Sequence, residues 1–264
     1  MRMSYVDTTE GQIHYRRDGT GEPLLLLHQT PIYAETHELV PLLANNFQVI
    51  AMDTVGYGNS YIPSREYEIE DFGRSVISFL DGLGIKKTSI FGHHTGATIG
   101  VEVATAYPEY VDKLILSGCP YWSTERWEEY LRPIRERLSQ PWLTNDGQFL
   151  LRSWQLFKNY SPNTGPETWI KAFICAVTSR ASSLYDAHFA VGRYDIISKM
   201  PLIKSPTLLI SGSNDMFLDL LETTRSTIPR CRTQVIEEAG VLICLEKPKE
   251  LAQAIIDFMN NPGA

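Results

Sequence analysis

A histidine between two glycines is the residue of this chain whose setting most favours chemistry. The pentapeptide Gly-His-His-Thr-Gly at residues 92–96 joins a short apolar strand, Thr88–Gly92, to a helix, Thr95–Tyr107. This spacing is typical of a strained strand-to-helix turn that exposes its middle side chain, here His94. A neutral imidazole can abstract a proton, donate a hydrogen bond to an oxyanion or attack a carbonyl. We therefore expect His94 to stand at the centre of a small-molecule site.

The helix that follows the turn sets the electrostatics around His94. A helix N-terminus carries about half a positive charge, which disfavours a second cation, so we expect an uncharged imidazole. Thr95 opens the helix, and we expect its backbone N–H, rather than its hydroxyl, to face the site. Such an N–H can stabilise negative charge that develops on a substrate oxygen.

Strands and helices alternate on both sides of this turn. Apolar runs predict seven strands, at Gln12–Arg17, Leu24–His28, Phe47–Asp53, Thr88–Gly92, Val111–Ser117, Pro206–Ser211 and Thr233–Glu237. Helical spacing after Ile69, after Thr95 and in Pro248–Met259 separates several of them. This rhythm predicts an α/β fold with a mostly parallel sheet and helices on both faces.

The pattern changes between residues 121 and 200. Helical stretches at Glu125–Ser139, Gly147–Tyr160 and Glu167–Ser179 follow one another without a convincing strand. We expect a helical cap at 121–200, inserted into a core made of 1–120 and 201–264. The cap carries all five tryptophans, Trp122, Trp127, Trp142, Trp154 and Trp169. These rings can build a small core of the cap or line an apolar pocket, and we expect a mixture that includes Trp122 at the pocket.

Four further segments appear in a fixed order around the turn. They are Leu24–Pro31, Asp53–Ser60, Ser211–Asp215 and Ala239–Pro248. Together with residues 92–96 they resemble the α/β-hydrolase superfamily, in particular its small capped members. The resemblance implies an eight-stranded, mostly parallel sheet flanked by helices, with the cap inserted after strand 6.

The resemblance also implies a catalytic triad, but two of its three residues are absent. The nucleophile position holds His94, the acid position Asp215 and the base position Val241. In this family a serine attacks the substrate, a histidine takes its proton and a carboxylate orients the histidine. A triad of His94, Val241 and Asp215 cannot form a serine acyl-enzyme, so His94 must work alone, work with Asp215 or merely bind a ligand.

The expected substrate site surrounds His94. Gln29 replaces a glycine of the family and adds an amide side chain beside the expected oxyanion hole, to which Thr30 and Thr95 contribute. His28, which has a structural interpretation as well, completes this set together with Trp122.

Two functions from different classes are compatible with these residues. The first is an atypical hydrolase, or a lyase, decarboxylase or cyclase, that acts on a small, partly apolar carbonyl compound. His94 would then be a general base or an oxyanion partner, with Asp215 as the second catalytic residue. The alternative is a receptor-like protein that binds a small ligand without turnover. A hydrolase relic without a site of its own is a third interpretation.

Composition indicates which classes of partner and which cellular compartment to expect. The 264 residues carry a net charge of −7, which argues against nucleic acids and anionic membranes. The N-terminus lacks a signal-like apolar segment and no run is long enough to span a bilayer, so we expect a cytoplasmic protein. The four widely spaced cysteines predict reduced thiols. We expect neither a metal nor a cofactor, and a homodimer is compatible with the sequence.

Overall fold

An eight-stranded sheet forms the centre of the computed structural model, which describes residues 1–138, 145–160, 164–182 and 187–263. The strand order is β1-β2-β4-β3-β5-β6-β7-β8. The strands are β1 (Arg2–Asp7), β2 (Gln12–Asp18), β3 (Pro23–Leu27), β4 (Gln48–Met52), β5 (Thr88–His93), β6 (Val111–Ser117), β7 (Thr207–Gly212) and β8 (Cys231–Ile236). β1 and β2 pair antiparallel with their neighbours, and all other pairs are parallel. The fold predicted from the sequence is confirmed.

Helices cover both faces of the sheet, because successive side chains of a strand point to opposite sides. In β3, Leu25 and Leu27 join an apolar cluster with α2 (Ile69–Gly82) and α3 (Thr95–Ala106). Leu24 and Leu26 join a second cluster on the other face, with α1 (Val40–Leu43) and α11 (Pro248–Asn260). All four leucines are fully buried, which explains the uninterrupted apolar run in their strand.

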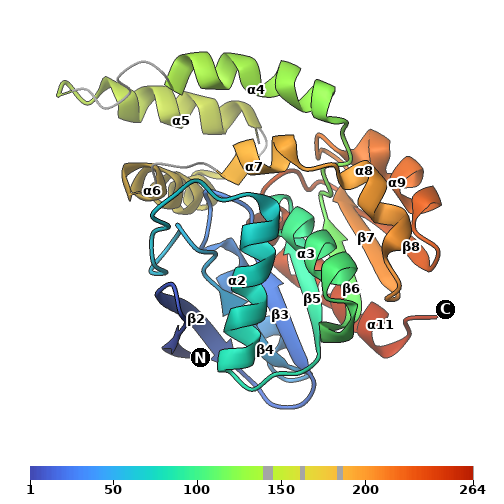
Figure 1. Cartoon of the computed structure of the whole chain (residues 1–264). Helices are drawn as coiled ribbons and strands as arrows, with labels where there is room; N and C mark the ends of the chain where they lie inside the picture. The colour runs from blue at the N-terminus through green and yellow to red at the C-terminus, as the bar shows by residue number, and fades with distance from the viewer. Residues whose placement is uncertain (139–144, 161–163, 183–186, 264) are drawn as a thin grey trace.

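Helices make up most of the described residues between β6 and β7. They include α4 (Thr124–Leu138), α5 (Gln148–Tyr160), α6 (Pro166–Ser182), α7 (Ala187–Arg193) and α8 (Ile196–Lys199). Figure 1 shows α4 to α7 gathered at the end of the sheet where β5 and β6 finish. In parallel α/β folds ligands bind at this edge, outside the carboxyl ends of the strands.

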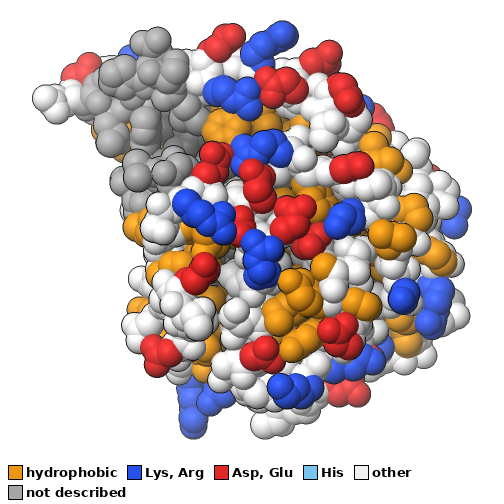
Figure 2. Space-filling model, in the orientation of Figure 1, with side chains coloured by type: hydrophobic (Ala, Val, Ile, Leu, Met, Phe, Trp, Pro, Cys, Tyr) orange, Lys and Arg blue, Asp and Glu red, His pale blue; other side chains and the backbone are white. Residues whose placement is uncertain are grey.

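Ion pairs join these helices to the sheet layer. Arg193 at the end of α7 contacts Glu66 and Glu68, 2.9 Å from each, just before α2. Figure 2 shows many acidic and basic side chains on this face of the molecule. Tyr194 and Lys199 contact Glu102 of α3 at 2.7 and 3.2 Å. The segment that leads from the helices back to the sheet is therefore anchored on α2 and α3.

Short helical segments complete the chain. They are η1 (Glu35–Glu38), η2 (Pro108–Tyr110), η3 (Met200–Leu202), η4 (Leu218–Leu220), α9 (Leu221–Thr227) and α10 (Ile243–Glu246). In the described ranges, no helix combines the length and the apolar character that a bilayer span requires.

Candidate functional site

His94 lies in the turn between β5 and α3, with a backbone φ of 48° that is unusual for a residue with a side chain. Two glycines let the chain close this turn. A Cβ on Gly92 would lie 2.3 Å from the Gly96 carbonyl oxygen, and a Cβ on Gly96 would lie 2.2 Å from the carbonyl oxygen of Leu27 in β3. The same close approach brings the start of α3 against the end of β3, where the Gln29–Thr30 loop begins.

The structure brings His94 and Asp215 together. Nε2 of His94 lies 2.8 Å from Oδ2 of Asp215, although 121 positions separate the two residues. Oδ1 of Asp215 accepts a hydrogen bond from the Phe217 backbone N–H at 2.8 Å. Burial opposes ionisation of Asp215, but the His94 ring, its hydrogen bond and the Phe217 amide outweigh it, so the pKa of Asp215 is lowered. Asp215 is therefore a carboxylate that accepts a hydrogen bond from the imidazole.

This contact determines which nitrogen of His94 can react. A carboxylate only accepts hydrogen bonds, so Nε2 carries a hydrogen, and in the uncharged form of the ring Nδ1 carries a lone pair. Nδ1 has no hydrogen-bond partner among the described residues. The His94 side chain is 13% exposed, whereas that of Asp215 is 1% exposed. His94 therefore offers one oriented, unoccupied nitrogen.

Gly118 makes room for this pair, and the sequence reading missed it. A Cβ at this position would lie 2.5 Å from Nε2 of His94 and 2.9 Å from Oδ2 of Asp215, and its φ is +55°. The available signal was a glycine directly after β6, the strand next to β5. Gly118 is required both for its own backbone conformation and for the His94–Asp215 contact.

Thr30 and Thr95 meet at the expected oxyanion hole. Their hydroxyl oxygens lie 2.9 Å apart, and both residues are buried. The Thr95 hydroxyl therefore contacts the Gln29–Thr30 loop. Within the described ranges, neither the Thr30 nor the Thr95 backbone N–H donates to a protein acceptor. Two unoccupied backbone donors thus lie on adjoining segments beside His94, as stabilisation of an oxyanion requires.

Gln29 lies beside these threonines, and its side-chain N–H groups are occupied. Nε2 donates to Oε2 of Glu35 at 2.7 Å and to the Val241 carbonyl oxygen at 2.8 Å. The Gln29 backbone N–H donates to Oε1 of Glu35 at 2.8 Å. Gln29 therefore supplies no free amide donor to the oxyanion hole.

Glu35 was not singled out by the sequence, where it is one acid in a short polar segment. It is completely buried in η1. Burial raises the pKa of Glu35 to about 8, although the two hydrogen bonds from Gln29 act in the opposite direction. Gln29 therefore binds a buried carboxyl group beside which no Lys or Arg of the described residues lies.

Val241 occupies the position of the family base with an apolar side chain. That side chain belongs to a small buried cluster with Ile32 and with Ala172 and Cys175 of α6. The Val241 carbonyl oxygen also lies 3.1 Å from Nε2 of His93. Burial lowers the pKa of His93 to about 3, so the ring is neutral. The tautomer with its hydrogen on Nε2 donates to this carbonyl and can accept at Nδ1 from the Ser117 hydroxyl, 3.1 Å away. No imidazole stands at the base position.

His28 has no ring nitrogen left for a substrate. Its Nδ1 donates to the Gln29 carbonyl oxygen at 2.7 Å, and its Nε2 accepts from the Thr54 backbone N–H at 2.9 Å. Burial lowers the pKa of His28 to about 4, which keeps the ring neutral. The structure supports the structural interpretation of His28.

Aromatic rings extend from His94 toward the helices between β6 and β7. The Phe217 ring lies 5.2 Å from that of His94, and the Trp122 ring lies 5.0 Å from Phe217. Trp127 packs on Trp122, with 5.0 Å between the ring centres. The indole N–H groups of both tryptophans are buried without a partner within the described ranges. The site therefore has an aromatic wall with two unused donors.

The other tryptophans of this region lie elsewhere. Trp154 of α5 and Trp169 of α6 pack on each other at 6.1 Å. Trp142 lies outside the described residues. The tryptophans thus form two pairs among the described residues, Trp122 with Trp127 and Trp154 with Trp169.

A buried group of Glu35, His93 and Cys244 has the composition of a metal site. One ligand atom from each lies within 4.8 Å of the others. However, Glu35 and His93 use these atoms for hydrogen bonds to Gln29 and to the Val241 carbonyl. Burial also raises the pKa of the Cys244 thiol well above its usual value, which disfavours the thiolate that a metal needs. These residues form a hydrogen-bonded core rather than a cation site.

The thiols do not suggest covalent chemistry either. All four cysteines are free. Cys119 follows β6 close to the site, and its burial raises the pKa of its thiol. A thiol that remains protonated is a poor nucleophile.

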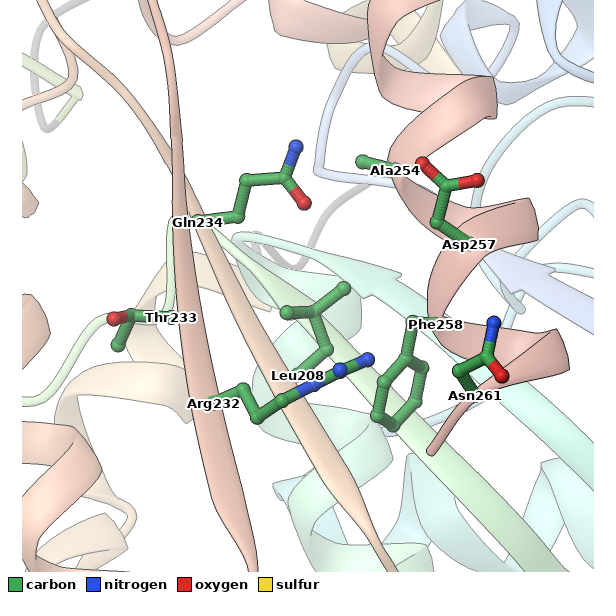
Figure 3. A pocket seen from close by; sticks show the side chains of 8 residues that line it. All are labelled: Leu208, Arg232, Thr233, Gln234, Ala254, Asp257, Phe258 and Asn261. Carbon is green, nitrogen blue, oxygen red and sulfur yellow. The ribbon is translucent and has the colours of Figure 1, made fainter. Parts of the chain in front are cut away.

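A separate groove of about 400 Å³ lies between β8 and α11. Figure 3 shows Arg232 and Gln234 on one wall and Asp257 and Phe258 on the other. The Arg232 guanidinium lies over the Phe258 ring, 5.1 Å from its centre. None of the residues expected at the substrate site lines this groove.

Several known proteins resemble the chain. A hydrolase from Metapseudomonas resinovorans, named for 2-hydroxy-6-oxo-6-(2'-aminophenyl)hexa-2,4-dienoic acid, is 28% identical, and the alignment covers 97% of this chain and 90% of that protein. Human epoxide hydrolase 4 is 27% identical over 94% of this chain and 75% of its own length. The structure of a thermophilic esterase from Thermogutta terrifontis superimposes with a TM-score of 0.84 at 22% identity, covering all of both chains.

The family comparison agrees with the sheet order and the turn at His94. A family model described as alpha/beta hydrolase fold matches residues 22–248. Because this span contains β3 to β8, the strained turn and the intervening helices, the chain belongs to the α/β-hydrolase fold family.

Proposed function

We propose that this protein is an enzyme that acts on a small, partly apolar carbonyl compound without forming a serine acyl-enzyme. The observation that carries the proposal is the 2.8 Å contact between Nε2 of His94 and Oδ2 of Asp215. It leaves Nδ1 of His94 free to accept a proton and keeps a carboxylate behind the ring. Asp215 can then stabilise the imidazolium that forms, as the carboxylate of a triad does.

The surroundings of His94 suit a carbonyl substrate. The unoccupied backbone N–H groups of Thr30 and Thr95 can donate hydrogen bonds to an oxyanion and so stabilise its negative charge. Phe217 and Trp122 provide an aromatic surface against which an apolar part of the substrate can pack. In the relative from M. resinovorans, the named acid contains a ketone, which supports the same substrate class for this chain.

The proton moves from the substrate or from water to Nδ1 of His94. Abstraction from the carbon next to the carbonyl leaves an enolate, whereas abstraction from water lets hydroxide attack the carbonyl carbon. Either step places negative charge on the carbonyl oxygen, close to the Thr30 and Thr95 amides. The imidazolium then returns its proton to the product, so the cycle requires no covalent enzyme intermediate. Atypical hydrolysis and lyase or cyclase reactions can begin with one of these two proton transfers. In decarboxylation, by contrast, loss of carbon dioxide from the substrate carboxylate leaves the enolate, which the same two amides can stabilise and which then takes up a proton.

The test is turnover of a panel of esters, lactones and β-keto acids by the wild-type protein and by His94→Ala. General-base catalysis contributes about 10²- to 10⁴-fold, so the variant should lose at least about 100-fold in kcat. His94→Gln, which keeps a polar side chain without a base, should be equally impaired. Equal rates for wild type and His94→Ala would remove His94 from the chemistry.

A second candidate function is ligand binding without turnover. Two buried indole N–H groups without a partner, in Trp122 and Trp127, and the apolar Val241 at the base position favour it. Such a protein would show ligand-dependent quenching of tryptophan fluorescence, and the ligand would be recovered unchanged. In both cases the partner is a small molecule, and we propose that residues 121–200 act as the cap over it.

A further inference from the structure

We infer that Gln29 presents its side-chain carbonyl oxygen to the ligand, so that the site selects carbonyl compounds with a hydroxyl or N–H group next to the reacting carbonyl. This inference deepens the proposed function and rests on it for the carbonyl class. It assigns Gln29 the role of a hydrogen-bond acceptor, in contrast to the amide donors of Thr30 and Thr95 beside it.

The first support is the fixed orientation of the Gln29 amide. The amide atom that contacts Glu35 lies 2.8 Å from the Val241 carbonyl oxygen. A backbone carbonyl only accepts hydrogen bonds, so this atom is nitrogen whatever the protonation state of Glu35. Both of its hydrogens are used, one toward Val241 and one toward Glu35. The amide plane therefore cannot turn over without losing these two bonds.

The second support is that the carbonyl oxygen of the Gln29 amide lacks a partner among the described residues. Oε1 of Gln29 accepts no hydrogen bond from the described residues. Oε1 is not completely enclosed either, so it keeps some contact with solvent, although Gln29 as a whole is only 7% exposed. Buried carbonyl groups in proteins normally have a partner. An oriented acceptor with residual access is what a ligand donor would use.

The third support is the location of Gln29. The residue immediately precedes Thr30, whose hydroxyl bonds Thr95 at 2.9 Å, next to His94. Its amide is anchored on the backbone of Val241, the position where the family places the catalytic base. His93, which shares that carbonyl, has its ring centre 4.5 Å from the ring centre of His94. The Gln29 side chain is therefore linked to His94 through the Val241 carbonyl and the His93 ring.

Selectivity follows from the cost of an unsatisfied acceptor. A ligand with a donor at this position replaces the solvent contact of Oε1 with a hydrogen bond. A ligand with a methyl ether at this position displaces the solvent from Oε1 but donates no hydrogen bond in return. The unsatisfied Oε1 weakens binding by about tenfold. The preference concerns binding, so it can be measured separately from turnover.

The experiment is a thermodynamic cycle by calorimetry with two proteins and two ligand pairs. The ligand pairs are α-hydroxyacetophenone with α-methoxyacetophenone, and hydroxyacetone with methoxyacetone. The wild-type protein should bind the hydroxyl member of a pair about tenfold more tightly, and Gln29→Met should bind both members within about twofold. Gln253→Met on the exposed face of α11 is the matched control and should keep the wild-type preference. Melting curves of the variants report whether they fold.

A second variant keeps Gln29 and changes its anchor. Glu35→Gln replaces one carboxyl oxygen with an amide nitrogen, which cannot accept from Gln29, so the Gln29 amide can lose one of the two hydrogen bonds that orient it and keep only the one to the Val241 carbonyl. The hydroxyl preference should then fall by at least fivefold. Three results would overturn the inference. The wild-type protein binds neither hydroxyl ligand, it binds both members of each pair equally well, or its preference for the hydroxyl member survives in Gln29→Met.

The outcomes separate this inference from the proposed function. If His94-dependent turnover is found but the hydroxyl preference is absent, only the role of Gln29 fails. If the preference is found and His94→Ala turns over every substrate as fast as wild type, the acceptor stands and the general-base role of His94 fails.

Discussion

The buried carboxyl group of Glu35 makes the stability of this protein depend on pH over a defined window. Glu35 is completely enclosed, and its pKa is raised from 4.5 to about 8, chiefly by burial. Because the folded chain holds this proton more tightly than the unfolded chain, Glu35 contributes its full stability below pH 4.5. That contribution is lost as the pH rises through about 8. Each unit by which the pKa of Glu35 differs between the folded and unfolded chain is worth 1.36 kcal/mol, so the full loss amounts to roughly 5 kcal/mol.

The perturbation that isolates this effect is Glu35→Gln, which removes the titrating group and keeps the side-chain volume. Urea unfolding followed by circular dichroism at pH 5 and pH 8.5 gives the free energy of unfolding of each protein. The wild type should lose roughly 4 kcal/mol more than the variant between the two pH values, because part of the full effect lies below pH 5 and above pH 8.5. The constant cost of the lost hydrogen bond to Gln29 cancels in this difference.

Glu38→Gln is the matched control, because Glu38 lies in the same short helix and forms an exposed ion pair with Lys171 at 2.7 Å. Exposed pairs contribute little to stability, so this variant should follow the wild type across the pH range. Parallel pH curves for wild type and Glu35→Gln would refute the reasoning, since they would mean that Glu35 ionises alike in the folded and unfolded chains.

Two further predictions concern the His94–Asp215 pair. Gly118→Ala would place a Cβ 2.5 Å from Nε2 of His94 at a φ of +55°, so it should destabilise the fold by about 1–3 kcal/mol and abolish turnover. Gly165→Ala, which meets no atom within 4 Å, should leave both the melting temperature and turnover unchanged. Asp215→Asn should lower kcat by about 10²- to 10⁴-fold without unfolding the protein, because it removes the charge that orients and stabilises His94. Since the pKa of Asp215 is lowered on folding, its contribution to stability should be lost as the pH falls below the usual range of an aspartate; an Asp215→Asn protein with the acid-unfolding profile of wild type would contradict this.

The sequence was informative wherever the physical requirement is local. Four consecutive leucines in β3 indicate a strand buried on both faces, and the structure confirms it. The glycines at 92 and 96 indicate the strained turn, because other side chains would collide with backbone atoms there. By contrast, β1 was missed, because this edge strand is exposed over most of its length and carries a weak apolar pattern.

The hydrogen bonds among Gln29, Glu35 and Val241 could not be predicted from neighbouring residues in the sequence. Gln29 was singled out as a departure from the family pattern that adds an amide side chain beside the expected oxyanion hole. Its orientation depends on the carbonyl of Val241, 212 positions away, and on a glutamate that lies within an unremarkable polar segment. Glu35 and Gly118 matter only because folding brings them against Gln29 and His94.

The sequence by itself determined the fold family, the strained turn and the identity of the residue that the turn presents, since apolar periodicity and glycine spacing act over a few neighbouring positions. Only the tertiary structure decided that Asp215 reaches Nε2 of His94, that Nδ1 remains free, and that Gln29 turns its carbonyl rather than its amide nitrogen outward. The physical reason is that a hydrogen bond depends on distances and directions within about 3 Å, which only the packing of distant segments sets.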